Sequence, residues 1–214
     1  MDKIFFFNFL NEYYFFKHFK NSKNTLKKMN TKKTSKKNLN KVTHPFSPVY
    51  SGTSKILILG SIPSPASFSN GFYYMHPLNR FWPVMEKIFE HKFIYKNKEG
   101  EKAIEERKKF LLKHDIALWD VIKQCEIKGA SDSSIKNPIP NNFNEIIQNS
   151  EISKIFCTGN ISYKLYEKLC RSNTGIKSIC LPSTSPANQK RWPMDKLVEE
   201  YKKNIIPALD DKKK

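Results

Sequence analysis

The sequence lacks the cysteine spacings that staple small domains or bind metals. Its four cysteines, at positions 125, 157, 170 and 180, lie 32, 13 and 10 residues apart, which matches no zinc-finger or iron–sulfur pattern. It also lacks a run of about eighteen apolar residues, so we expect no membrane-spanning helix. The short apolar stretch Ile4 to Leu10 has no small-residue cleavage site after it, which disfavours a secretory signal. We therefore expect neither a structural metal nor a membrane partner.

Acidic residues are scarce beside basic ones: 20 Asp and Glu oppose 38 Lys and Arg, which gives a net charge of +18. Residues 1–41 hold eleven lysines against only Asp2 and Glu12, and the last three residues are lysines. Residues 42–211 contain 24 basic and 18 acidic residues. This modest surplus of positive charge suits a globular domain that faces a polyanion. Nucleic acid is therefore the first partner class to consider.

The length of 214 residues allows one ordinary domain with an appendage. Residues 1–41 are rich in Lys, Asn, Phe and Tyr but show no periodic apolar face, so we expect a disordered or targeting leader that adds non-specific DNA affinity. Nothing in it separates a nuclear from an organellar destination. We place the folded domain at 42–208 and a charged tail at 209–214.

From residue 55 onward, short apolar β-prone runs alternate with amphipathic stretches, which is typical of a parallel sheet covered by helices on both faces. The predicted strands are Lys55–Leu59, Ile116–Val121, Lys154–Thr158 and Lys177–Leu181. The predicted helices are 81–89, 101–113, 143–148, 161–170 and 195–206.

In such sheets, ligands bind beyond the carboxyl ends of the strands. The residues there are rich in Gly, Pro, Ser and Asn. They are Gly60–Ser64, Trp119–Asp120, Gly159–Asn160 and Pro182–Asn188. A single loop of this composition could be an ordinary turn, since Gly, Pro and Ser are common in turns. Two such loops, Gly60–Ser64 and Pro182–Asn188, are harder to explain in this way. We therefore expect the functional site at this edge.

Residues 60–82 read GSIPSPASFSNGFYYMHPLNRFW. This order of a Gly–Pro turn, an aromatic cluster, His-Pro and Asn-Arg-Phe-Trp resembles the uracil-DNA glycosylase superfamily. ALWD at 117–120, GASDS at 129–133 and LPSTSPAN at 181–188 resemble its hypoxanthine-DNA glycosylase branch. The resemblance spans roughly residues 54–206. It implies an α/β fold, a three-layer α/β/α sandwich around a mainly parallel four-stranded sheet.

The resemblance also implies a monofunctional DNA-deoxyinosine glycosylase. Such an enzyme binds damaged DNA as a monomer, flips out hypoxanthine, with uracil or xanthine as further substrates, and hydrolyses the N-glycosidic bond without a metal or cofactor. Breaking this bond develops positive charge on the sugar and negative charge on the base, so the site needs fixed dipoles and one oriented water. No lysine stands in a signature loop as a nucleophile, so we expect no strand-cleaving step.

The candidate for holding the attacking water is an asparagine. In the mismatch-specific uracil branch the first loop reads GINPG and its Asn positions the water, whereas this chain has Ile62 there. By motif position the role passes to Asn79 of HPLNRFW, which would position the water rather than deprotonate it. Asn is also a favoured helix cap, and NRFW occurs in the mismatch-specific branch too, so capping is the alternative and both roles are compatible.

Asp120 is the acid–base alternative. It stands where the classical uracil enzymes place the Asn that reads the base. A carboxylate only accepts hydrogen bonds, so it suits the N1–H of hypoxanthine, a proton that adenine lacks and guanine shares. Capping of a turn at the strand end is the structural alternative. In the second signature loop the usual His or Asn is replaced by Ser183, which stabilises negative charge less than a protonated His.

The remaining candidates line the base pocket or face the DNA. Counted back from Asn79, Tyr74 stands where the mismatch-specific branch has the Phe that stacks on the base, so the resemblance gives Tyr74 that role. The base-pocket candidates are Ile62, Pro63, Tyr74, His76 and Ser183. The DNA-facing candidates are Ser61, Ser64, Ser185, Asn188, Lys190 and Arg191. For His76 the alternative is a purely structural role in its loop. For the serines the alternative is that they are only solvated. The loop after the second predicted strand is ambiguous: Ser131 and Ser133 are candidates to line the base pocket, whereas phosphates would repel Asp132 unless it turns away to cap its segment.

Three other functions stay open. The loss of the usual first-loop Asn and second-loop His fits a catalytically silent DNA-lesion-binding protein. A uracil-preferring mismatch glycosylase is the second alternative. A small-molecule hydrolase using Ser61 or Ser64 is disfavoured, since the sequence has no G-x-S-x-G elbow.

Overall fold

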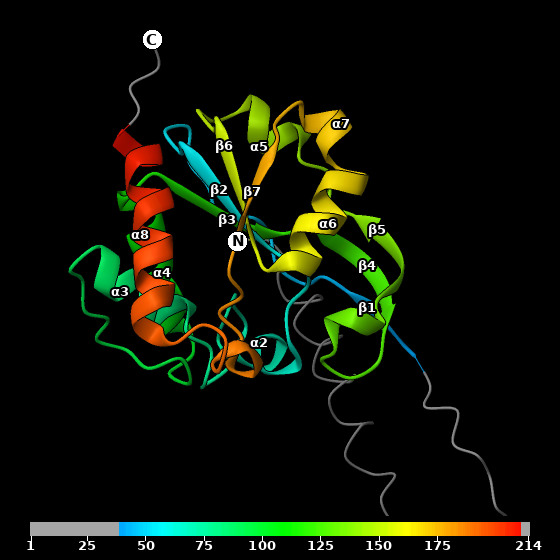
Figure 1. Ribbon diagram of the computed structural model, residues 1–214, viewed down its shortest axis with the longest axis horizontal. Helices are drawn as coiled ribbons and strands as arrows, with labels where there is room; N and C mark the ends of the chain where they lie inside the picture. Colours follow the sequence, from blue (N-terminus) through cyan, green and yellow to red (C-terminus); the bar gives the residue numbers. More distant parts are fainter. Residues whose placement is uncertain (1–38, 211–214) are drawn as a thin grey trace, which may run out of the picture. The chain divides into compact units, whose positions relative to one another are not determined.

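A four-stranded parallel sheet forms the centre of the domain in the computed structural model, which describes residues 39–210 (Figure 1). Its spatial order is β3 (Ile116–Asp120), β2 (Ile56–Gly60), β6 (Lys154–Thr158) and β7 (Ser178–Leu181). Each strand lies within one residue of its expected ends. The predicted α/β fold with a four-stranded parallel sheet is confirmed.

Both faces of this sheet are buried. In β2, Ile56 and Ile58 pack into one apolar cluster and Leu57 and Leu59 into another, and all four side chains are inaccessible to solvent. Successive side chains of a strand point to opposite faces, so a continuous apolar run needs cover on both sides. The run ILIL therefore fixes β2 as a central strand.

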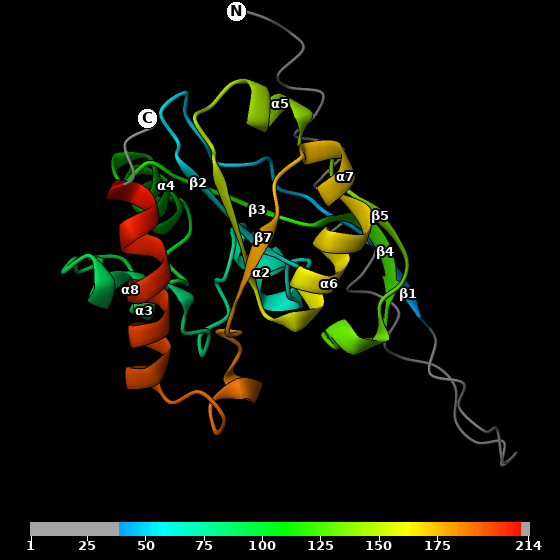
Figure 2. The same cartoon turned by 45° about the horizontal axis from the view of Figure 1, so that its top comes forward.

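Helices supply most of that cover (Figures 1 and 2). One face carries α3 (Phe81–Ile88), α4 (Glu101–Lys113) and α8 (Met194–Asp210). The other carries α5 (Asn144–Gln148), α6 (Asn160–Leu169) and α7 (Arg171–Thr174). All five expected helices are present. The short α2 (Pro65–Asn70) and α7 were not expected. Ser64 caps α2 and Pro65 begins it, as is usual at a helix start.

A second, antiparallel sheet has no counterpart in the sequence expectations. It consists of β1 (Asn40–Thr43), β4 (Ile122–Ile127) and β5 (Lys136–Pro140) in the order β1-β4-β5. β4 continues the chain of β3 after Val121. β1 begins two residues before the expected domain boundary, because pairing with β4 satisfies its backbone. At the other end α8 runs to Asp210, past the expected boundary, with Ala208 buried.

Two single turns of 3-10 helix complete the described elements: η1 (Asp132–Ser134) and η2 (Pro186–Asn188). The rest of the expected leader, and the last lysines, lie outside the described residues. Between residues 39 and 210 no helix has the length and hydropathy needed to cross a bilayer.

Candidate active site

The carboxyl ends of the four strands bring the expected loops to one edge of the sheet. Gly60 pairs in register with Asp120, and Thr158 with Leu181. The loop after β7 lies at the same end of the sheet as α2 in both views (Figures 1 and 2). The first and last signature loops therefore share one edge, as the strand order requires.

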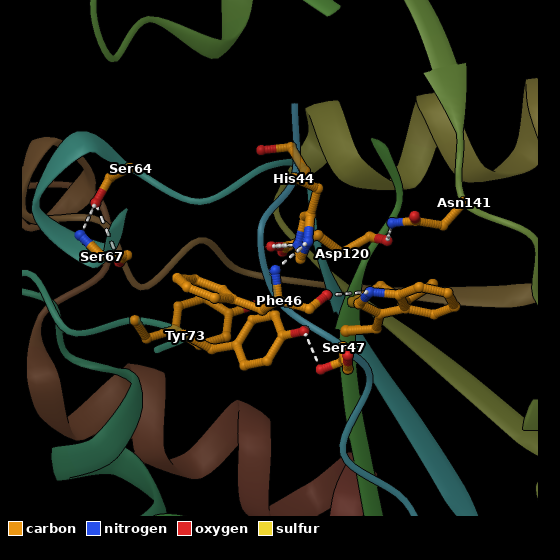
Figure 3. A network of polar contacts seen from close by, with 12 residues as sticks. His44, Phe46, Ser47, Ser64, Ser67, Tyr73, Asp120 and Asn141 are labelled. Carbon is orange, nitrogen blue, oxygen red and sulfur yellow. Dashed lines mark hydrogen bonds and ion pairs between the residues drawn. The ribbon is translucent and has the colours of Figure 1, made fainter. Parts of the chain in front are cut away.

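Asp120 is the most constrained polar residue at this edge (Figure 3). It is only 3% exposed, and its Oδ2 lies 2.9 Å from Nε2 of His44. The Asn141 side chain donates to the backbone carbonyl of Asp120 at 2.9 Å. Oδ1 lies directly over Gly60, where a Cβ would stand 2.2 Å from it. Only glycine at position 60 leaves room for this carboxylate.

Tyr74 is held beside Asp120 in a strained backbone conformation, with φ at +56°. Its ring stacks on Phe81, with centroids 4.1 Å apart, and its hydroxyl lies 2.8 Å from Oγ1 of Thr158. Burial, together with the nearby Asp120 carboxylate, raises the pKa of the Tyr74 phenol well above its ordinary value, so the hydroxyl stays neutral. The ring is only partly buried, so Tyr74 remains the candidate for stacking on a base.

Asn79 lies at the start of α3, in a tight turn. Its N–H donates to the carbonyl of His76 at 2.9 Å, and its Oδ1 accepts the backbone N–H of Phe81 at 2.9 Å. The imidazole Nδ1 of His76 accepts the N–H of Leu78 at 3.1 Å, so His76 supports the same turn. The capping alternative for Asn79 is therefore present in the structure. A carboxamide oxygen has two lone pairs, so capping leaves one acceptor site for a water.

Arg80 ties this turn to the loop after β7. Its backbone N–H donates to the carbonyl of Thr184 at 3.1 Å, and its buried guanidinium donates to carbonyl groups of the same loop. Those acceptors are the carbonyls of Ser183, Thr184, Ser185 and Trp192. Burial lowers the pKa of the Arg80 side chain, and the carbonyl dipoles around the guanidinium stabilise its positive charge. Sequence reasoning passed over Arg80, although it stands inside the motif NRFW.

The serines expected at phosphates are occupied within their own loops. Ser64 caps α2 and Ser185 caps η2. The Ser183 hydroxyl accepts the N–H of Ser185 at 3.3 Å, and the Asn188 amide donates to the Ser183 carbonyl at 3.1 Å. These short-range bonds are typical of Ser and Asn in turns. Lys190 and Arg191 are exposed, and the described residues show no ion pair for either.

Asp132 turns inward to the first loop and does not cap its own segment. The Ser61 hydroxyl, itself buried, donates to Oδ2 of Asp132 at 2.5 Å. Burial and the neighbouring Asp120 raise the pKa of Asp132, and the Ser61 hydrogen bond opposes that shift. Ser131 and Ser133 are exposed and contact each other instead. The first loop therefore presents a Ser–carboxylate pair, which favours a pocket role for Ser61 over a phosphate contact.

The two apolar pocket candidates are packed into the protein. Ile62 belongs to the apolar cluster that covers one face of the sheet, and Pro63 is buried beside it. Ile62 thus takes a core position where the mismatch-specific branch carries its Asn. A polar group that acts on a substrate here must therefore come from a residue other than Ile62.

A sequence model of the Uracil DNA glycosylase superfamily matches residues 47–210. The chain belongs to this superfamily. A hypoxanthine DNA glycosylase of Methanosarcina acetivorans is 33% identical over 145 residues, which covers 68% of this chain and 87% of that protein. The protein of the same name from Methanosarcina barkeri is 30% identical over the same coverage.

A solution NMR structure from M. acetivorans, described as a candidate uracil DNA glycosylase, superimposes with a TM-score of 0.62. It is 27% identical and covers 79% of this chain and 99% of that structure. The family resemblance seen in the sequence is thus confirmed.

The superfamily match begins after His44, the residue in closest polar contact with Asp120. Sequence reasoning missed His44 because it stands in a polar stretch beside the basic leader. The segment His-Pro-Phe gives no periodic signal. What could have pointed to it is the pairing of the preceding residues with β4, and that pairing is visible only in the fold.

Gly60→Ala tests the close approach of Asp120 to the strand end. The new Cβ would collide with Oδ1 of Asp120 and press on the Tyr74 hydroxyl, 3.0 Å away. We expect DNA-glycosylase activity to fall about a hundredfold, measured as base release in single-turnover assays, because misplacement by an ångström is enough for such a loss.

Gly52→Ala is the matched control. Its Cβ would meet nothing closer than 4.0 Å, and its backbone is not left-handed, so activity and melting temperature should stay at wild-type values. Wild-type activity in Gly60→Ala would contradict the crowded arrangement at the strand end.

Proposed function

We propose that this chain is a monofunctional DNA glycosylase that removes hypoxanthine from deoxyinosine by hydrolysis and leaves an abasic site. One observation supports the proposal above others: Asp120 and Tyr74 lie together beside Gly60, at the strand ends of a superfamily fold whose curated relatives are named hypoxanthine DNA glycosylases. Asn79 stands on the turn that Arg80 ties to the loop after β7. Uracil is the second candidate base, because the matching NMR structure is described as a candidate uracil DNA glycosylase.

The proposed chemistry needs little acid–base strength. Cleavage separates a sugar cation from a base anion, and the enzyme gains most by fixing dipoles and one water before the bond breaks. Asn79 is the proposed water holder, its amide oriented by the Phe81 N–H. Activation of the water by Asp120 is the alternative to this role of Asn79, and it would replace the role in base recognition that is proposed for Asp120 below.

Base recognition is proposed to use Oδ1 of Asp120. His44 engages Oδ2, and between residues 39 and 210 no hydrogen bond to Oδ1 is found. A carboxylate oxygen accepts the N1–H of hypoxanthine but repels the N1 lone pair of adenine. Stacking of the base on the partly buried Tyr74 ring would then supply about 1–3 kcal/mol, which offsets part of the cost of flipping.

The DNA backbone is proposed to contact the rim formed by the loop after β7. Lys190 and Arg191 project from this loop, and exposed cations supply most of the salt-dependent affinity for DNA.

Leu78 lies at the tip of the neighbouring turn and is 67% exposed. An apolar side chain at this place suits insertion between base pairs, since such wedges unstack neighbouring bases. Asn188, one of the expected DNA-facing residues, is bonded within its own loop.

The function is tested on duplexes that carry one inosine, uracil or xanthine, followed by alkali to cut abasic sites. We expect cleavage at inosine by the full chain, weaker cleavage at uracil, and none at adenine or without alkali. Uncut strands for every lesion would refute a glycosylase. If tight lesion-dependent binding remained, the chain would be a silent lesion binder.

Asn79→Ser separates catalysis from capping. Serine still accepts the Phe81 N–H but offers no carboxamide, so the melting temperature should hold while the rate falls about a hundredfold. Asn79→Ala should lose the same activity and also about 1 kcal/mol of stability, read from denaturant unfolding. Near-normal rates in Asn79→Ser would make Asn79 a cap alone and leave Asp120 as the catalytic group.

Leu78→Ala tests the wedge. Flipping a base from a duplex costs a few kcal/mol more than from a single strand, so we expect excision from duplex DNA to slow about tenfold and from single-stranded DNA hardly at all. Ile94→Ala is the control, since Ile94 is 80% exposed in a loop before α4. Equal slowing on both substrates would contradict a wedge role.

A further inference from the structure

The segment that precedes the superfamily match is fastened across the strand that carries Asp120. The N–H of His44 donates to the carbonyl of Lys123 at 2.7 Å, and Val49 forms a two-way backbone bridge with Leu118. These contacts lie on either side of Asp120 along the chain. Residues 44–49 therefore pass next to Asp120 in a fixed register.

The His44 ring is held in one orientation. Its Nδ1 accepts the backbone N–H of Phe46 at 3.1 Å, so a neutral ring carries its proton on Nε2 and donates it to Asp120. Phe46 meets the ring edge-on at 5.6 Å and Tyr73 lies against it at 5.8 Å. The side chains of His44 and Asp120 are 2% and 5% exposed, so water does not compete for this bond.

The two carboxylate oxygens of Asp120 have different surroundings. Oδ2 is engaged by His44, and Oδ1 faces the space above Gly60 beside the Tyr74 hydroxyl. Asn141 fixes the backbone behind it. Without the His44 bond the carboxylate could rotate about its Cβ–Cγ bond, because nothing else between residues 39 and 210 holds Oδ2.

We infer that His44 is a positioning residue for base excision: it holds the Asp120 carboxylate so that Oδ1 faces the flipped nucleotide. This inference rests on the proposed glycosylase function. It assigns a role to a residue outside the matched region, 47–210. Neither neighbouring tyrosine competes with His44 for the carboxylate, because the Tyr73 hydroxyl donates to the Ser47 carbonyl at 2.9 Å and the Tyr74 hydroxyl lies 2.8 Å from Oγ1 of Thr158.

Three variants of the full chain test this role on inosine duplexes. His44→Leu removes the donor, and we expect its single-turnover rate to fall about a hundredfold while affinity for undamaged duplex is retained. His44→Gln places an amide N–H near the position of Nε2, so it should recover most of the lost rate. His114→Leu is the control. The His114 ring packs on Phe89 and Phe110 and has no contact with Asp120, so the rate of this variant should match that of the wild type.

A double-mutant cycle separates positioning from a general effect on folding. If His44 acts through Asp120, His44→Leu should slow the Asp120→Ala enzyme by less than threefold. A full additional loss in that background would overturn the inference, as would equal rates for His44→Leu and wild type. If Asp120→Ala leaves no measurable rate, the comparison of His44→Gln with His44→Leu decides, since equal losses in both overturn it.

The two proposals fail in different ways. A wild-type chain that releases no base from any lesion overturns the glycosylase function and this inference with it. A wild-type chain that releases hypoxanthine, with a His44→Leu variant of equal rate, overturns only the role of His44.

Discussion

The site depends on the register between β2 and β3. Their parallel pairing sets Gly60 beside Asp120 at the last position of both strands, so the carboxylate lies over bare backbone. A shift of one residue would turn Asp120 to the opposite face of the sheet. The apolar runs of both strands prevent that shift, because each residue between Ile56 and Leu59 is already buried on its own face. The core thus fixes the position of a polar group.

Arg80 provides the second constraint, between segments that are far apart in sequence. It joins the turn that carries Asn79 to the loop after β7, through its backbone N–H and its side chain together. Burying a guanidinium costs free energy unless its donors are satisfied, and here backbone carbonyls satisfy them. A cation held by backbone rather than by a carboxylate keeps its positive charge. That charge lies under the rim proposed to contact phosphates.

The sequence predicted the central sheet and the site edge because both follow from local patterns: apolar runs mark the strands, and Gly, Pro and Ser mark their exits. It did not predict β1, β4 and β5, whose residues NKVT, IKQCEI and KNPIP mix charge with apolar groups. Such strands form because a neighbour satisfies their backbone, a tertiary effect without a local signal. His44 and the Ser61 partner of Asp132 were missed for the same reason, since each contact joins residues that lie more than 70 positions apart.

The charges at this edge have opposite signs at different depths. Asp120 and Asp132 lie inside, each with a hydrogen-bonded partner, whereas Lys190 and Arg191 are exposed on the loop outside. A phosphate is attracted by the outer pair and repelled by the inner carboxylates, so the backbone of a bound strand stays on the rim. A neutral base meets no such barrier. Under the proposed function, the buried carboxylates would thus also decide which part of a nucleotide enters. The loop serines Ser64 and Ser185, which cap short helices, would then not be needed at the phosphates.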